Sequence, residues 1–333
     1  MATLQEEFRV FHDEIRLGTY DEDQNLRDKR DTLIRELRNE LKDEKIPDTE
    51  RSLTFTKLDQ GSYAMRTGIK PINDDYDIDV GVVFDITNDE YCSRNLKKLV
   101  FDALNKRHKR TVKYNKPCIT VEYADGYHVD LAIYSNNNND LHIAWGRSTA
   151  TEQKWYESDP KGLKRWVSDV SNNAEYSKQF RCCVRYLKKW KAKHFTSIGN
   201  TAPPSIGLTV QARQHFIFNK DNDLTSLINI VRKIKSDFSM QFDLDDFILK
   251  RSISYKLPQK PYKNIYYKMS LLQQDQFYEK LVSLEEALCE ARDENSEQAA
   301  SLILRKVFGK DFPLVENIKR ADIRPVIGTG FNA

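Results

Sequence analysis

Three aspartates have the types and spacing of a metal-dependent active site. Asp77 and Asp79 lie two residues apart in a segment, residues 77–84, whose polar and apolar side chains alternate as in a strand. Side chains two apart leave the same face of a strand, with Cα atoms about 6–7 Å apart. Asp130 lies in a later alternating segment, residues 128–133. If these strands are neighbours, three carboxylates meet, and such hard oxygen ligands suit Mg²⁺ or Mn²⁺.

A turn before the first two aspartates makes this pattern more specific. Taken alone, two aspartates at this spacing could be only the polar face of a half-exposed strand. Gly61 and Ser62, however, follow directly after a strand-like segment that ends at Gln60. Glycine permits a tight turn, and exposed backbone N–H groups with a serine hydroxyl can hold a phosphate. The combination predicts a site for a phosphorylated substrate, where two ions could activate a hydroxyl and neutralise a leaving pyrophosphate.

The elements that must position these residues fall into two halves. Residues 3–46 predict a helix with one apolar stripe, and residues 53–145 alternate in the manner of strands around a helix over 91–107. A turn at residues 125–126 predicts a hairpin that contains Asp130. The remainder predicts mostly helix, with later helices near residues 205–218, 223–236, 268–293 and 296–308.

The expected fold class is therefore α+β, a mixed sheet with helices followed by a C-terminal helical domain. The default place for an active site is the cleft between the two. The expected division is an N-terminal helical segment that packs on the core, a catalytic core, a helical domain and a flexible tail: residues 1–48, 49–165, 166–320 and 321–333.

Composition excludes several classes of protein. The 333 residues hold 53 Lys and Arg against 50 Asp and Glu, a net charge of +3, too balanced for binding duplex nucleic acid by charge alone. No apolar run approaches the ~18 residues of a membrane helix, and the acidic N-terminus does not resemble a secretion signal. The five cysteines are odd in number and form no C-x-x-C pair, which favours reduced thiols and a cytoplasmic location.

The motifs resemble those of the DNA polymerase β-like nucleotidyltransferase superfamily, and within it the CD-NTases. These are bacterial relatives of cyclic GMP-AMP synthase and oligoadenylate synthetase, found in CBASS anti-phage operons. The sequence QGSYAMRT at residues 60–67, followed by DIDVGV at residues 77–82, carries the resemblance. Further similar segments lie at residues 158–163, 185–190 and 203–208.

This resemblance implies a metal-binding role for the three aspartates. Asp77 and Asp79 would ligate both catalytic ions, two Mg²⁺ or Mn²⁺ per site. Asp130 would ligate the ion near the attacking ribose hydroxyl and act as the base for that hydroxyl. The resemblance thus gives all three carboxylates a catalytic role.

It also implies a set of contacts to the donor triphosphate. Gln60, Gly61 and Ser62 would hold the triphosphate, and Lys188 would reach its β- and γ-phosphates. Ser205, at an expected helix start, would bind the same group, because a helix N-terminus favours anions. Simpler alternatives remain open for two of these residues: Lys188 could lie on a solvated cationic face, and Ser205 could serve only as a helix cap.

Other residues near these motifs have more than one interpretation. Lys189 is the neighbouring alternative to Lys188. Met65 stands where some family members place an aromatic residue that stacks on the base, which weakens any inference about the base. Tyr134 and Tyr63 could stack instead or could be core residues. His128 shares a strand face with Asp130 and is expected to be a bystander.

The resemblance predicts an enzyme that joins ribonucleoside triphosphates, ATP among them, into a cyclic di- or trinucleotide. The product would be a second messenger that reaches a downstream effector, and the enzyme is expected to be a monomer. A small last residue, Ala333, matches family members whose tail is conjugated by a ubiquitin-ligase-like E1/E2 enzyme. The alternatives are a nucleotidyltransferase that acts on another acceptor (a linear oligonucleotide, an RNA end, a protein or a small molecule) and a nucleotide-binding scaffold without catalysis.

One further acidic cluster has no such context. Asp243, Asp245 and Asp246 lie in the expected helical half without a preceding Gly-Ser turn. They are expected to cap a helix or face solvent.

Overall fold

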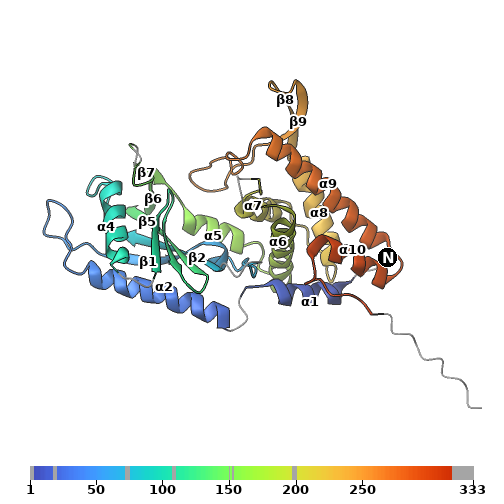
Figure 1. Ribbon diagram of the computed structural model, residues 1–333, viewed down its shortest axis with the longest axis horizontal. Helices are drawn as coiled ribbons and strands as arrows, with labels where there is room; N and C mark the ends of the chain where they lie inside the picture. Colours follow the sequence, from blue (N-terminus) through green and yellow to red (C-terminus); the bar gives the residue numbers. More distant parts are fainter. Residues whose placement is uncertain are drawn as a thin grey trace, which may run out of the picture.

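The computed structural model describes residues 4–17, 21–71, 76–106, 110–149, 151, 154–196 and 201–316. A lobe built on a β-sheet and a lobe built of helices lie side by side, joined near α5 (Pro160–Ser168) (Figure 1). The predicted α+β fold class is confirmed. The expected C-terminal tail, with Ala333, lies outside the described residues.

The first lobe contains a seven-stranded mixed sheet. Its central path runs β1-β2-β5-β4-β3, and β6 pairs with β5 and in turn with β7. Only β2 and β5 run parallel among the pairs of this sheet in the described residues. The strands are β1 Phe55–Asp59, β2 Tyr76–Phe84, β3 Arg110–Tyr114, β4 Ile119–Tyr123, β5 Tyr127–Asn137, β6 Asp140–Trp145 and β7 Lys154–Glu157.

Two helices cover one face of this sheet, α2 (Asp21–Glu40) and α4 (Ser93–Asn105). The leucine stripe of α2, including Leu33 and Leu37, packs in one cluster with the even-numbered residues of β2, such as Val80. Because alternate residues of a strand face opposite sides, the odd-numbered residues of β2 face away from these helices. The binary pattern of one strand therefore places both Asp77 and Asp79 on the uncovered face.

The second lobe packs helices around α6. Asn173 begins α6 by accepting hydrogen bonds from two backbone N–H groups of its first turn. Ser270 and Gln273 form a capping box at the start of α9. The helices of this lobe are α1 Gln5–Ile15, α6 Ala174–His194, α7 Ser205–His215, α8 Asp223–Ser236, α9 Leu271–Asp293 and α10 Glu297–Phe308.

The prediction of one helix over residues 3–46 was wrong. The backbone becomes extended at Arg16, which ends α1. The reason lies in the two apolar stripes: α1 presents Phe8 and Phe11, which pack on Tyr186 and Phe308 of the helical lobe, whereas the leucines of α2 face the sheet. The N-terminal segment thus serves both lobes.

A second feature was not predicted, an antiparallel hairpin that projects from the helical lobe (Figure 1). Its strands are β8 Phe238–Asp243 and β9 Ile248–Ile253. The acidic cluster lies at the turn, where Lys250 pairs with Asp243 and Asp246, so these carboxylates cap no helix. The alternation Phe-Ser-Met-Gln-Phe at residues 238–242 was the signal for this strand.

The hairpin of β4 and β5, with its turn at residues 125–126, is confirmed, as is the helix over residues 91–107. Across the part of the chain that the structure describes, no helix has both the length and the apolar character needed to cross a membrane.

Candidate active site between the sheet and the helical lobe

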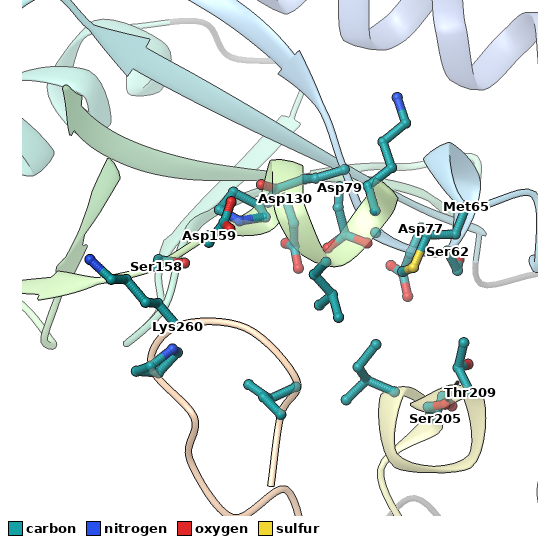
Figure 2. Close-up of a pocket in the computed structure, with 18 of the residues that line it drawn as sticks. Ser62, Met65, Asp77, Asp79, Asp130, Ser158, Asp159, Ser205, Thr209 and Lys260 are labelled. Atoms are coloured by element: carbon teal, nitrogen blue, oxygen red, sulfur yellow. Dashed lines mark hydrogen bonds between the residues drawn. The ribbon is translucent and has the colours of Figure 1, made fainter. Parts of the chain in front are cut away.

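A cavity of about 450 Å³ lies where the two lobes meet. The uncovered face of β2 and β5, the short helix α3 (Gly61–Ala64) and the start of α5 form one wall. The start of α7 and a loop at residues 257–261 form the other. Figure 2 shows aspartates on the sheet side facing Ser205 and Thr209 across this space.

The strand register brings the aspartates onto this one cavity. In the parallel β2–β5 pair, Asp79 lies opposite Asp130 and Asp77 lies opposite His128. All three carboxylates line the cavity (Figure 2). Burial, and then the negative charge of Asp130, raises the pKa of Asp79 to about 6, while the Lys188 ammonium opposes the shift. Two carboxylates that disfavour each other's charge in this way form a site that a cation would stabilise.

Asp77 and its neighbour His128 lie at the rim of the site. The Asp77 side chain is 68% exposed, and its Oδ1 lies 3.7 Å from His128 Nδ1. Among the described residues, no three acidic, histidine or cysteine side chains stand close enough together to hold a metal ion as they are. The donor chemistry, three carboxylates on adjacent strands around one cavity, nevertheless fits Mg²⁺ or Mn²⁺. Electrostatic repulsion favours a larger separation of the carboxylates, and a bound cation would offset that repulsion.

The Gly-Ser turn is built against Asp79. Gly61 begins α3 with φ +71°, a conformation that favours glycine, and a Cβ at this position would lie 1.9 Å from Asp79 Oδ2. Ser62 and Gln60 line the cavity beside it. The Gly61–Ser62 turn and the Asp79 carboxylate therefore lie on one wall, and their close approach requires a glycine at position 61.

Tyr134 holds Gln60 in place. Its hydroxyl donates to Gln60 Oε1 at 3.0 Å, and burial raises the pKa of Tyr134 above its ordinary value. With its carbonyl oxygen engaged in this way, Gln60 keeps its amide N–H₂ group for other acceptors. The Tyr63 hydroxyl instead accepts a hydrogen bond from Arg27 Nε. Met65 is buried in the core cluster of the helical lobe and also lines the cavity.

The basic side chains of α6 lie in different environments. Lys188 Nζ donates to the carbonyl oxygen of Thr67 at 2.9 Å and to its hydroxyl at 3.1 Å. Burial, followed by the charges of Arg185 and Lys191, lowers the pKa of Lys188 to about 7. Lys189, the neighbouring alternative, forms an ion pair with Asp311. Lys188 therefore lines the cavity, whereas Lys189 is tied to the chain after α10.

Lys191 is a residue that sequence reasoning missed. Its Nζ donates to Ser205 Oγ at 2.7 Å, which places an ammonium beside the first residue of α7. Burial lowers the pKa of Lys191. The available signal was the spacing of Lys188 and Lys191, because residues three apart share one face of a helix. Ser205 thus lies where an ammonium and a helix N-terminus meet, an arrangement that favours an anion.

Arg185, on the same helix, has a structural role. It is buried, and its guanidinium donates to the carbonyl oxygen of Gly68 at 3.0 Å and lies 3.0 Å from Nε2 of His12. These contacts tie α6 to the segment after α3 and to α1. The cationic face expected from the sequence is therefore largely buried and engaged rather than solvated.

The loop at residues 257–261 contributes Leu257, Lys260 and Pro261 to the lining of the cavity. Lys260 Nζ lies 3.3 Å from Asp140 Oδ1 and 3.5 Å from Glu157 Oε1. The carbonyl oxygen of Lys260 accepts from the backbone N–H of Asp159, whose carboxylate caps α5 by accepting from Gly162 N at 2.7 Å. Neither Lys260 nor the loop was predicted from the sequence, because no motif marks it.

Part of this chain matches the model of a known protein family. Residues 56–134 match the family model described as cyclic GMP-AMP synthase DncV-like, nucleotidyltransferase domain. A protein of Escherichia albertii named cyclic GMP-AMP synthase is 30% identical over 197 residues. That match spans 56% of this chain and 42% of the relative's length.

Solved structures share the fold over nearly the whole chain. The apo form of Vibrio cholerae DncV superposes with a TM-score of 0.74 at 18% identity and covers 93% of this chain and 96% of that one. The same protein with a nonhydrolyzable GTP gives a TM-score of 0.70 at 19% identity, covering 90% and 93%. Escherichia coli DncV with 3′-deoxy GTP gives 0.68 at 16%, covering 90% and 93%. The resemblance read from the sequence is confirmed for residues 56–134, which match a DncV-like nucleotidyltransferase domain, and the solved structures show that the rest of the chain shares the fold.

Proposed function

We propose that this chain joins ribonucleoside triphosphates into a cyclic di- or trinucleotide and releases pyrophosphate at each step. The observation that carries the proposal is the cavity between the lobes, which has carboxylates on one wall and an ammonium-backed helix N-terminus on the other. Carboxylates suit divalent cations, and the helix start suits phosphate oxygens. A nucleoside triphosphate with bound Mg²⁺ or Mn²⁺ has both of these complementary features.

The carboxylates would hold the cations. Asp77 and Asp79 would ligate two ions and Asp130 one of them; the ions would activate the ribose hydroxyl and neutralise the leaving group. Asp79 must be deprotonated to bind a cation, and its pKa of about 6 leaves it largely ionised at neutral pH. Asp130 would take the proton of the attacking hydroxyl as the oxygen–phosphorus bond forms. The bond from the α-phosphorus to the bridging oxygen breaks, and pyrophosphate leaves with that electron pair.

The opposite wall would hold the triphosphate. We assign the terminal phosphates to Ser205 and Lys191, with Lys188 close by. The Gly61–Ser62 turn, on the carboxylate wall, would contact the same triphosphate. Lys188 has a pKa of about 7, so a bound polyanion beside it would favour the charged ammonium. A positive charge fixed beside the phosphates would offset the negative charge that develops on the leaving pyrophosphate.

Two features bear on which bases are used. The Escherichia albertii relative is named a cyclic GMP-AMP synthase, and one Vibrio cholerae structure contains the linear intermediate pppA(3′,5′)pG. We propose ATP as one substrate and GTP as the first candidate for the other. Met65 offers a thioether rather than a ring for contact with the base, which is expected to relax selection through stacking.

The biological setting follows from the family resemblance. We propose that the product is a second messenger in CBASS anti-phage signalling and that the protein acts in the cytoplasm. An E1/E2 enzyme acting on Ala333 belongs to the same proposal, and that residue lies outside the described part of the chain.

The test is product analysis with purified protein. The protein is incubated with Mg²⁺ or Mn²⁺ and all four ribonucleoside triphosphates, treated with phosphatase and analysed by mass spectrometry, with an Asp77→Ala/Asp79→Ala variant as control. A phosphatase-resistant cyclic product that is absent from the control supports the proposal and identifies the bases. Pyrophosphate release with only linear or macromolecular products would instead indicate another acceptor, and nucleotide binding without turnover would indicate a scaffold.

A further inference from the structure

Asp130 accepts a hydrogen bond from a residue that is not one of the proposed metal ligands. Thr120 on β4 lies directly opposite Asp130 on β5 in the antiparallel pair, so the two side chains share a face of the sheet. The Thr120 hydroxyl donates a hydrogen bond to Asp130 Oδ1. Thr120 is buried, whereas Asp130 is partly exposed to the cavity. One carboxylate oxygen is thereby engaged from the neighbouring strand, by a residue that does not line the cavity.

Asn115 sets the direction of that hydrogen bond. Its Nδ2 donates to Thr120 Oγ1 at 2.8 Å, which occupies a lone pair of the hydroxyl. A threonine hydroxyl has a single hydrogen, and an ionised carboxylate can only accept. Since the amide supplies the donor on one side, the hydrogen of Thr120 is directed to Asp130. The three groups therefore form a chain with one polarity, from Asn115 through Thr120 to Asp130.

A buried lysine fixes the start of this chain. Lys97 on α4 is 1% exposed, and its ammonium donates to the carbonyl oxygens of Asn115, Lys116 and Gly146 at 2.7, 2.9 and 3.0 Å. An ammonium has three N–H donors, so all three are used. The turn that carries Asn115 is further closed by its backbone N–H, which donates to the carbonyl oxygen of Cys118. The position of the Asn115 amide is thus set by the helix that covers the other face of the sheet.

We propose that Thr120 is a positioning residue for the proposed reaction. Its hydroxyl, oriented by Asn115, holds one oxygen of Asp130 and so fixes the plane in which the other oxygen meets the cation and the attacking ribose hydroxyl. This inference rests on the proposed function, because it gives Asp130 a purpose that requires a fixed orientation. Residues that hydrogen-bond a metal-ligating side chain change metal affinity or activity by 10–100-fold when they are removed.

The test compares substitutions that separate the hydroxyl from the volume of the side chain. Thr120→Val removes the hydroxyl at nearly constant volume, Thr120→Ser keeps it, and Thr120→Ala removes it with less crowding should the valine variant fail to fold. Thr111→Val, at an exposed position on β3, is the matched control. Each protein is measured for Mn²⁺ binding by electron paramagnetic resonance with a nonhydrolysable ATP analogue, and for kcat and KM.

The inference predicts that Thr120→Val lowers kcat and weakens binding of one Mn²⁺ by about 10–100-fold. The KM for triphosphate stays within about threefold, because the hydrogen bonds of Thr120 go to Asn115, Cys118 and Asp130 and to no residue assigned to the phosphates. Thr120→Ser and Thr111→Val behave like the unsubstituted protein. Wild-type Mn²⁺ affinity and kcat in Thr120→Val, or an equal loss in Thr120→Ser, would overturn the role of the hydroxyl. Failure of the proposed function has a different signature: the unsubstituted protein itself would bind no Mn²⁺ through Asp77 and Asp79.

Discussion

Gly61 and Asp79 occupy the same small volume: a Cβ on Gly61 would lie 1.9 Å from Asp79 Oδ2 and 2.7 Å from its Cβ. The Gly61–Ser62 turn and the Asp79 carboxylate are therefore one structural unit. The glycine is required twice here, by the close approach and by a φ of +71°. This explains in physical terms why a glycine immediately precedes Ser62.

Gly61→Ala is expected to abolish synthesis. The added methyl group must displace either the Asp79 carboxylate or the turn, and we expect at least a 100-fold loss of kcat because a misplaced group near the reacting atoms costs about that much. Gly309→Ala is the matched control, since Gly309 also has a positive φ, +95°, but its Cβ would meet only Lys193 Cδ at 3.7 Å. Gly309→Ala should lose about 1–2 kcal/mol of unfolding free energy because of its positive φ alone, and Gly61→Ala should lose at least as much, both measured by chemical denaturation. Full activity in Gly61→Ala would show that Asp79 does not need its observed position.

The wall opposite the carboxylates makes a separate prediction. Lys191→Met and Ser205→Ala should each raise the KM for triphosphate by about 10-fold, the effect of losing a hydrogen bond to a charged group. Lys188→Met should also raise KM, since the family resemblance assigns that residue to the triphosphate and its side chain lines the cavity. Lys189→Met is the control, because its partner is Asp311 rather than the cavity. Steady-state kinetics distinguish the cases, and an unchanged KM in Lys191→Met would remove that residue from the phosphate site.

Much of the site was accessible from the sequence because it depends on strand periodicity. The alternation around Asp79 and Asp130 predicts which face each side chain takes, and the parallel register supplies the remaining condition. Lys191 and Thr120 were missed for a different reason. Each acts through a contact between segments distant in the sequence: the spacing of Lys191 from Lys188 indicates a shared helix face but not the contact with Ser205, and a lone threonine such as Thr120 has no local pattern.

The fold shows the same division. Regular amphipathic segments such as α8, expected over residues 223–236, were found with those bounds. The separation of α1 from α2 depends on which core each apolar stripe joins, and that is a tertiary property. The β8–β9 hairpin shows how short strands are lost within a sequence dominated by helix.

Stability should depend on His12 at mildly acidic pH. Burial, and then the charge of Arg185, lowers the pKa of His12 to about 4, against about 6.5 in an unfolded chain. Between these values the unfolded chain binds a proton that the folded chain does not, so the free energy of unfolding falls as the pH drops from 6.5 towards 4. The full effect is about 3 kcal/mol.

His12→Gln should flatten this dependence. A glutamine carbonyl can accept from Arg185 in place of Nε2, and it does not titrate in this range. Chemical denaturation of both proteins at several values between pH 4.5 and 7.5 gives the comparison. Parallel curves for the two proteins would show that His12 is not the group responsible.

The central claim is that the register of β2 against β5 builds one cation site on which nucleotide condensation depends. Its most direct test is the rate of cyclic product formation by Asp79→Asn, which keeps the shape of the side chain but removes its charge. Asp59→Asn on β1 is the matched control, because Asp59 pairs with Arg30 of α2 on the helix-covered face of the sheet, away from the cavity. We expect Asp79→Asn to lose about 10³-fold or more in rate, since several kcal/mol of charge stabilisation depend on the cations, while Asp59→Asn stays within about threefold. A cyclic product formed at the normal rate by Asp79→Asn would contradict the account.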